Sequence, residues 1–168
     1  MRTPILSTFQ VCKGDRVIVD VKNDVYGAGV TVHWHGITQK GSPYSDGVPF
    51  LTQCPIENGN TFRYIWNANN AGTHFWHSHT GLHKLNGLYG PLIVREPQTT
   101  DVSGDLYDYD LTDHVLLLSD ALHEDTSEHF PGKLNARYQG QVPASFLING
   151  KGQFEVEFSE HYEKNYAL

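Results

Sequence analysis

The sequence has little positive charge, one methionine and no long apolar run. Its 168 residues contain 12 Lys and Arg against 19 Asp and Glu, a formal net charge of −7 with ten neutral histidines. The basic residues form no cluster, so nucleic acid and anionic membranes are poor candidate partners. No apolar stretch approaches the roughly 20 residues of a membrane span. The first fifteen residues, MRTPILSTFQVCKGD, also lack the apolar core of a signal peptide. Either the protein is cytosolic or its true N-terminus lies outside this sequence.

Sulfur-containing residues are too few for some metal sites. A blue copper centre needs two histidines, a cysteine and usually a weak axial methionine. The only methionine is Met1, and neither Cys12 nor Cys54 has a histidine nearby in the sequence. A blue copper centre inside this chain is therefore not expected. The two cysteines leave three states open: one disulfide, two outside partners or two free thiols.

Turn-forming and aromatic residues are abundant. The chain has 16 Gly, 8 Pro, 9 Tyr, 8 Phe and 3 Trp, a composition that fits a turn-rich β protein. No helical period appears before residue 97. Alternation of apolar and polar residues instead predicts strands at residues 15–23, 30–35, 61–66, 74–79 and 88–94. Short strands at close spacing, separated by clusters of Gly, Asn and Pro, predict a sandwich or barrel.

The second half of the chain begins with an acidic stretch. From Asp101 to Glu128 there are nine acidic residues and no Lys or Arg. Its first part, QTTDVSGDLYDYD, is typical of a solvated linker. A further strand is expected at residues 114–120, and an Asn-Gly pair within residues 145–154 predicts a hairpin. About sixty residues after Tyr107 are few for an independent core, so a second domain is expected to be incomplete.

Two His-x-His pairs are the strongest chemical signal. Residues i and i+2 of a strand share a face, so His33 and His35 point the same way, as do His77 and His79. The apolar set on the first of these strands lies on the opposite face and consists of Val30, Val32 and Trp34. Four imidazoles on one patch would suit copper, zinc, iron or nickel. Their spread over two strands favours more than one ion, although a mononuclear zinc or iron site remains open.

Four motifs give the chain a family resemblance: HWHG, SDGVPFLTQCPI, AGTHFWHSHTG and GLYGPLIV. Together, over residues 9–154, they resemble the first cupredoxin domain of laccase-type multicopper oxidases. The motif sequences are most similar to those of insect and other animal laccases. The resemblance implies an all-β fold with a cupredoxin-like Greek-key β-sandwich over residues 1–97, its first strand truncated. An acidic linker over 98–106 and an incomplete second cupredoxin domain over 107–168 are expected to follow.

The resemblance also implies a ligand set for a trinuclear copper cluster. By position, His33 would bind the type 2 copper, His35 and His77 one type 3 copper, and His79 the other type 3 copper. Asp46 matches an acid that helps to deliver protons during O₂ reduction, whereas on sequence alone Asp46-Gly47 is equally well a turn. The remaining histidines match no ligand position and are expected to be structural or exposed: His74, His83, His114, His123, His129 and His161.

The implied parent enzyme oxidises phenols or aromatic amines in one-electron steps and reduces O₂ to water, with copper doing the redox chemistry. The third and fourth histidine motifs and the type 1 copper site are absent, and the resemblance ends after Phe154. We therefore expect a fragment that supplies half of the cluster ligands, is inactive alone and lacks a C-terminal cupredoxin domain. By resemblance the parent is secreted, and Cys54 pairs with a C-terminal region in some relatives, so no partner within this chain is expected for it. Alternatives are a non-catalytic copper-binding or interaction module and a mononuclear zinc or iron enzyme.

Overall fold

Strands make up most of the regular structure. The computed structural model describes residues 7–123, 126, 143 and 145–153, and this part of the chain contains eight strands and three short 3-10 helices. The strands are β1 (Phe9–Cys12), β2 (Arg16–Lys22), β3 (Val32–His35), β4 (Thr61–Asn67), β5 (Gly72–Ser78), β6 (Tyr89–Arg95), β7 (Leu118–Ala121) and β8 (Ser145–Ile148). The 3-10 helices are η1 (Pro43–Ser45), η2 (Gly104–Leu106) and η3 (Thr112–His114). None of the described residues belongs to a helix with the length and apolar character that a membrane crossing requires.

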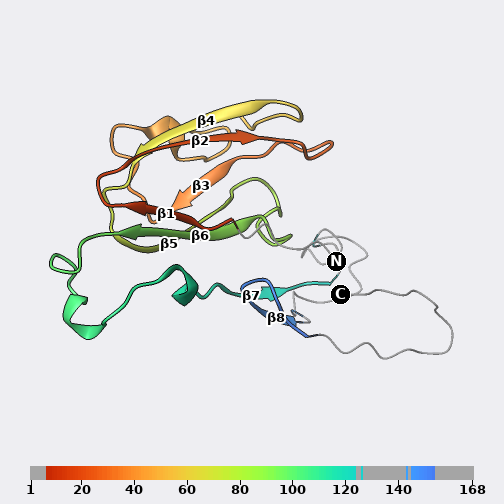
Figure 1. Ribbon diagram of the computed structural model, residues 1–168. Coiled ribbons are helices and arrows are strands. Elements are labelled where there is room, and N and C mark those ends of the chain that lie inside the picture. Colours follow the sequence, from red (N-terminus) through yellow and green to blue (C-terminus); the bar gives the residue numbers. More distant parts are fainter. Residues whose placement is uncertain (1–6, 124–125, 127–142, 144, 154–168) are drawn as a thin grey trace, which may run out of the picture.

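The first six strands form two layers (Figure 1). One layer is a four-stranded sheet in the order β1-β6-β5-β3, in which β1 runs parallel to β6 and the other pairs are antiparallel. The other layer is the antiparallel pair β2-β4. The chain passes from one layer to the other between β1 and β2, β2 and β3, β3 and β4, and β4 and β5. The sandwich predicted from the alternating segments is therefore confirmed.

The core between the layers sets the direction of the histidines. Alternate residues of each strand fill it, as predicted, and its largest members are Trp34, Tyr64, Trp66 and Trp76. The ring of Trp34, only 1% exposed, lies 5.5 Å from Phe9, 5.7 Å from Tyr64 and 5.3 Å from Trp66, centroid to centroid. Because successive side chains of a strand point to opposite faces, burying Trp34 turns its two histidine neighbours outward.

Residues 98–117 are largely exposed but are attached to the sandwich. Arg95 on β6 donates two hydrogen bonds to the Asp110 carboxylate, Nε to Oδ2 at 2.8 Å and Nη2 to Oδ1 at 3.0 Å. Thr112 donates to Gln10 Oε1 of β1 at 3.0 Å. Residues 98–112 are thus mostly exposed and are held to the sandwich at Asp110 and Thr112. The proposed linker at 98–106 and second domain at 107–168 stay a prediction.

The turn that follows β8 confirms the predicted Asn-Gly hairpin, in which Ile148 pairs with Lys151, and the bounds of β7 correct one predicted strand. Asn149 and Gly150 both have positive φ, 49° and 75°, as a type I′ turn requires. The predicted strand at 114–120 was wrong at its start, because β7 begins only at Leu118. The Asn149 side chain takes the place of a strand partner there: its Oδ1 accepts from Leu117 N at 2.8 Å and its Nδ2 donates to Val115 O at 3.2 Å.

Candidate metal centre

The four histidines of the two pairs converge on the outer face of the four-stranded sheet. His33 of β3 lies directly opposite His77 of β5, and their ring centroids are 5.4 Å apart. The ring of His35 lies 5.5 Å from both His33 and His77. His79, one residue beyond the end of β5, places its ring 5.5 Å from His33 and 5.9 Å from His77. The expected convergence is confirmed, whereas the assignment of each histidine to a particular copper stays a prediction.

Three of these rings bring nitrogen atoms within reach of one ion. One ring nitrogen from each of His33, His35 and His77 lies within 4.8 Å of the other two. The nearest pair is Nδ1 of His35 and Nε2 of His77, 3.3 Å apart. His79 adjoins the group without belonging to it. An all-imidazole donor set suits copper, so the residues fit that metal.

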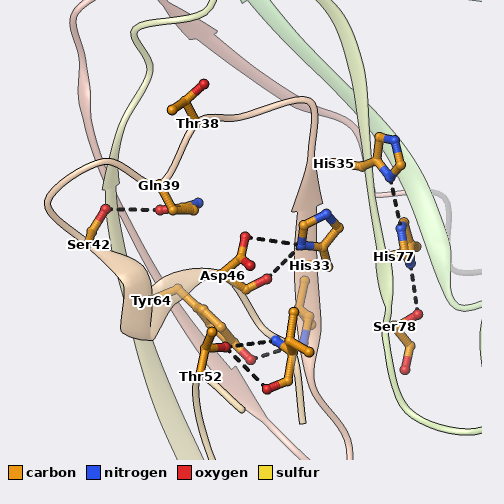
Figure 2. Close-up of polar contacts among 12 residues, drawn as sticks. His33, His35, Thr38, Gln39, Ser42, Asp46, Thr52, Tyr64, His77 and Ser78 are labelled. Atoms are coloured by element: carbon orange, nitrogen blue, oxygen red, sulfur yellow. Dashed lines mark hydrogen bonds and ion pairs between the residues drawn. The ribbon is translucent and has the colours of Figure 1, made fainter.

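Backbone carbonyls fix the protonation pattern of two of the rings (Figure 2). His33 Nδ1 lies 2.6 Å from the carbonyl oxygen of Asp46, and His77 Nδ1 lies 2.8 Å from that of Ser78. A carbonyl oxygen only accepts, so Nδ1 carries the proton in both rings and donates it. The lone pair of each ring is therefore on Nε2, directed away from the carbonyl. This arrangement is the one by which metal-binding histidines are commonly oriented.

Burial keeps the rings of His35 and His77 neutral. It lowers the pKa of His77 to about 4, and the nearby charges of Lys84, His33 and His35 act in the same direction. The pKa of His35 is also lowered, mainly by desolvation and to a smaller extent by the charges of His33 and Lys84. Both rings are therefore neutral at neutral pH, which is the form that binds a metal ion.

The loop that carries Asp46 is anchored on both sides. Ser45, fully buried, donates to Ile65 O at 2.9 Å and accepts from Ile65 N at 3.0 Å, which ties η1 to β4. Gly47 follows with φ +78°, so close to β3 that a Cβ built on it would lie 1.9 Å from Val32 O. These contacts bring the Asp46 carboxylate Oδ1 to 3.4 Å from His33 Nδ1. Asp46-Gly47 is thus a turn and also a contact to the histidine cluster.

The other histidines lie outside the group of converging nitrogen atoms. His74 is held through Nε2 by Asn70 O at 2.9 Å, and His83 lies 3.4 Å from Ser78 Oγ, with burial lowering its pKa. His114 is exposed, and His123 Nε2 lies 2.6 Å from Ser145 Oγ. The expectation that these are structural or exposed agrees with these contacts. His129 and His161 lie outside the described residues.

One site neighbour was missed in the sequence. Phe75 stacks on His35 and on His77, with ring centroids 4.7 Å and 5.0 Å away. Its position two residues before His77 already placed it on the same face, because side chains alternate along a strand. An aromatic residue at that position has an ordinary packing role, so nothing in the sequence distinguished it.

The two cysteines are both free and exposed. No bond joins Cys12 to Cys54, and the pairing of Cys54 with a C-terminal region of the parent stays a prediction. Of the three states open from composition, an internal disulfide is not the one that the structure has.

Comparison with known proteins finds a matching family model and related sequences. The sequence model described as multicopper oxidase matches residues 4–99. An L-ascorbate oxidase of Cucurbita pepo var. melopepo is 38% identical over 160 residues, which are 94% of this chain and 28% of that protein. Laccase-1 of Fomitopsis schrenkii is 40% identical over 146 residues, which are 84% of this chain and 25% of that protein.

Solved structures agree with the fold. A laccase from Botrytis aclada superposes with a TM-score of 0.76 at 37% identity, covering 89% of this chain and 26% of that one. The cupredoxin-type sandwich is thereby confirmed. The chain spans about a quarter of the length of these relatives.

Proposed function

Because the chain belongs to the multicopper oxidase family, we propose that it supplies four histidine ligands to the copper cluster of a laccase-type oxidase. The parent reaction is the one-electron oxidation of phenols or aromatic amines, coupled to reduction of O₂ to water. The observation that carries the proposal is the convergence of His33, His35 and His77, whose ring nitrogens lie within 4.8 Å of one another. Copper is the cofactor of the family and supplies the one-electron redox chemistry when bound.

The ligand roles follow the resemblance of the two His-x-His motifs to those of the family. We assign His33 to the type 2 copper, His35 and His77 to one type 3 copper, and His79 to the other. In support, His35 Nδ1 and His77 Nε2 are the nearest pair of ring nitrogens, at 3.3 Å.

Asp46 acts on the site in two ways. Its carbonyl oxygen accepts the Nδ1 proton of His33 and so leaves Nε2 of that ring free for metal. Its carboxylate is partly exposed, with a side-chain exposure of 31%, so it can exchange protons with solvent at the edge of the site. Reduction of O₂ to water consumes protons, and a carboxyl group at this position can hold one for delivery.

The remaining parts of the oxidase lie in other segments of the parent protein. A C-terminal cupredoxin domain would contribute the other cluster ligands and the type 1 copper, next to which the phenolic substrate is oxidised. The relatives' names include both laccases and L-ascorbate oxidases, so phenols and ascorbate are the reductants to compare. We place the parent outside the cell, in keeping with its resemblance to secreted laccases.

Copper binding tests the ligand set. His77→Ala is expected to weaken Cu(II) binding to the 168-residue chain at least about tenfold, because even residues that only support a ligand contribute about that much. His114→Ala, which removes an exposed imidazole elsewhere, is the control. Competition titration with a coloured chelator measures both affinities, and elemental analysis with EPR gives the number of coppers bound. Equal affinities in the two variants, or preferential binding of a single zinc or iron ion, would contradict the proposal.

Turnover by the chain alone is expected to be absent. Its sequence contains only two of the His-x-His motifs and no type 1 copper site, so electrons from a reductant have no route to the cluster. Oxygen uptake with a phenol and with ascorbate measures this, after subtraction of the rate given by a copper-treated His77→Ala chain. A residual rate with the native sequence would show that electrons enter by another route.

A further inference from the structure

A cation, a benzene ring and two imidazoles lie in contact at the edge of the metal centre. Lys84, in the loop between β5 and β6, places Nζ 5.1 Å from the centroid of the Phe75 ring. That ring is nearly parallel to His35, with 27° between the planes, and to His77, with 28°. The same ring therefore contacts both imidazoles whose nitrogen atoms meet at 3.3 Å.

The strand register produces this arrangement. Phe75 on β5 lies directly opposite His35 on β3 and two residues before His77 on its own strand. Directly opposed side chains on one face of an antiparallel pair are close neighbours. A flat ring at this position has an imidazole across the sheet and another along the strand.

His35 differs from the other two converging rings in what holds it. His33 and His77 are each fixed by a backbone carbonyl, from Asp46 and Ser78. For His35, which is exposed, the hydrogen bond that the structure gives is the one to His77. Apart from the edge contact with the His33 ring, stacking on Phe75 is thus the contact that sets the plane of the His35 ring independently of His77.

We propose that Phe75 and Lys84 are positioning residues of the metal centre: Phe75 fixes the ring planes of His35 and His77, and Lys84 holds Phe75 and places a positive charge beside the site. The inference about Lys84 rests on the proposed copper function, whereas the inference about Phe75 concerns ring geometry in the metal-free chain. A positive charge near a copper ion disfavours Cu(II) more than Cu(I), because the repulsion grows with the charge of the ion. Lys84 therefore shifts the site toward the reduced metal.

The proposed role of Phe75 is tested in the metal-free chain, by determining which tautomer His35 adopts. With the His77 proton on Nδ1, its Nε2 is an acceptor, so His35 carries its proton on Nδ1 in the native chain. Phe75→Leu is expected to release His35 to the Nε2-protonated form that free histidine favours, while His77 stays protonated on Nδ1. Long-range ¹⁵N–¹H NMR spectra of the imidazoles distinguish the two forms.

Controls separate positioning from loss of structure. Phe75→Tyr keeps the ring and is expected to retain the native tautomer, and Phe146→Leu makes the same change at an exposed site on β8. Circular dichroism verifies that each variant is folded. Retention of the Nδ1-protonated form of His35 in a folded Phe75→Leu chain would overturn this half. If Phe75→Leu does not fold, the Phe75→Tyr spectrum decides, because a changed tautomer despite the retained ring would also overturn it.

The Lys84 half is tested by affinities for Cu(II) and Cu(I). Lys84→Gln is expected to raise the ratio of Cu(II) to Cu(I) affinity about three- to tenfold, the size expected for one partly screened charge at this range. Lys84→Arg keeps the cation and should restore the native ratio, and Lys151→Gln removes the same charge from the turn that follows β8. Equal ratios in Lys84→Gln and Lys151→Gln would refute the role of Lys84. Failure of the native chain to bind copper would refute both the proposed function and the proposed role of Lys84. The proposed role of Phe75 would still be decided by the tautomer of His35.

Discussion

Trp34→Ala is expected to lower the free energy of unfolding by about 3–5 kcal/mol, the range for removing a large aromatic side chain from a packed core. Trp34 is 1% exposed and contacts aromatic rings from β1 and from β4. Its removal leaves a cavity between the two layers, directly behind His33 and His35. Urea denaturation measures the change, and copper binding is expected to fall with it because both histidines are held outward by this anchor.

Trp34→Phe is the matched variant for this result. The indole Nε1 of Trp34 is buried without a hydrogen-bond partner in the described part of the chain. Phenylalanine therefore gives up ring volume but no hydrogen bond, and the expected loss is only about 1–2 kcal/mol. A loss below about 1 kcal/mol for Trp34→Ala would mean that the core collapses to fill the space, contrary to the role given to Trp34.

Gly47→Ala is expected to destabilise the chain by about 3 kcal/mol or more, since the substitution combines two unfavourable effects. The backbone at Gly47 has φ +78°, and the added Cβ would lie 1.9 Å from Val32 O and 2.4 Å from Val32 C. The loop must therefore move away from β3, and the contacts of Asp46 with His33 are lost with it. Urea denaturation measures the first effect, and a crystal structure or the ¹⁵N spectrum of His33 measures the second.

Gly41→Ala separates the two contributions. Gly41 also has a positive φ, +86°, but a Cβ built on it meets nothing within 4 Å. Its substitution should lower stability by only about 1–2 kcal/mol, the effect of the left-handed conformation alone. Similar losses in the two variants would show that the loop at Gly47 shifts without strain and that β3 does not depend on it.

The direction in which the site residues point was predictable because it depends on strand period. Alternation places Trp34 inward and its two histidine neighbours outward, and the same rule separates His74 from His77. The first placement agrees with the burial of Trp34 and the exposure of His35, and the second agrees with the separate contact of His74 to Asn70 O. Pairing of the two strands brings His33 opposite His77, and the resemblance of the motifs to a known family anticipated this pairing.

Contacts made by loops and side chains across the fold were not predictable in the same way. The bond from His33 to the Asp46 carbonyl depends on a loop whose path is fixed by Ser45 and Gly47. The start of β7 depends on the Asn149 side chain, about thirty residues further along, and so no local pattern reveals it. The contact of Lys84 with Phe75 likewise joins a turn to a strand without a sequence signature.

The parallel pairing of β1 with β6 also bears on the order in which the protein is made. Phe9 pairs with Leu92, so the N-terminal strand has no place in its sheet until β6 has left the ribosome. His33 and His35 are likewise synthesised well before His77, their partner across the sheet. Contacts between residues far apart in sequence form late and slow the folding of β proteins. At the proposed copper site, metal uptake is therefore expected only after synthesis of β5, because a nascent chain that ends before His77 holds only one of the two histidine pairs.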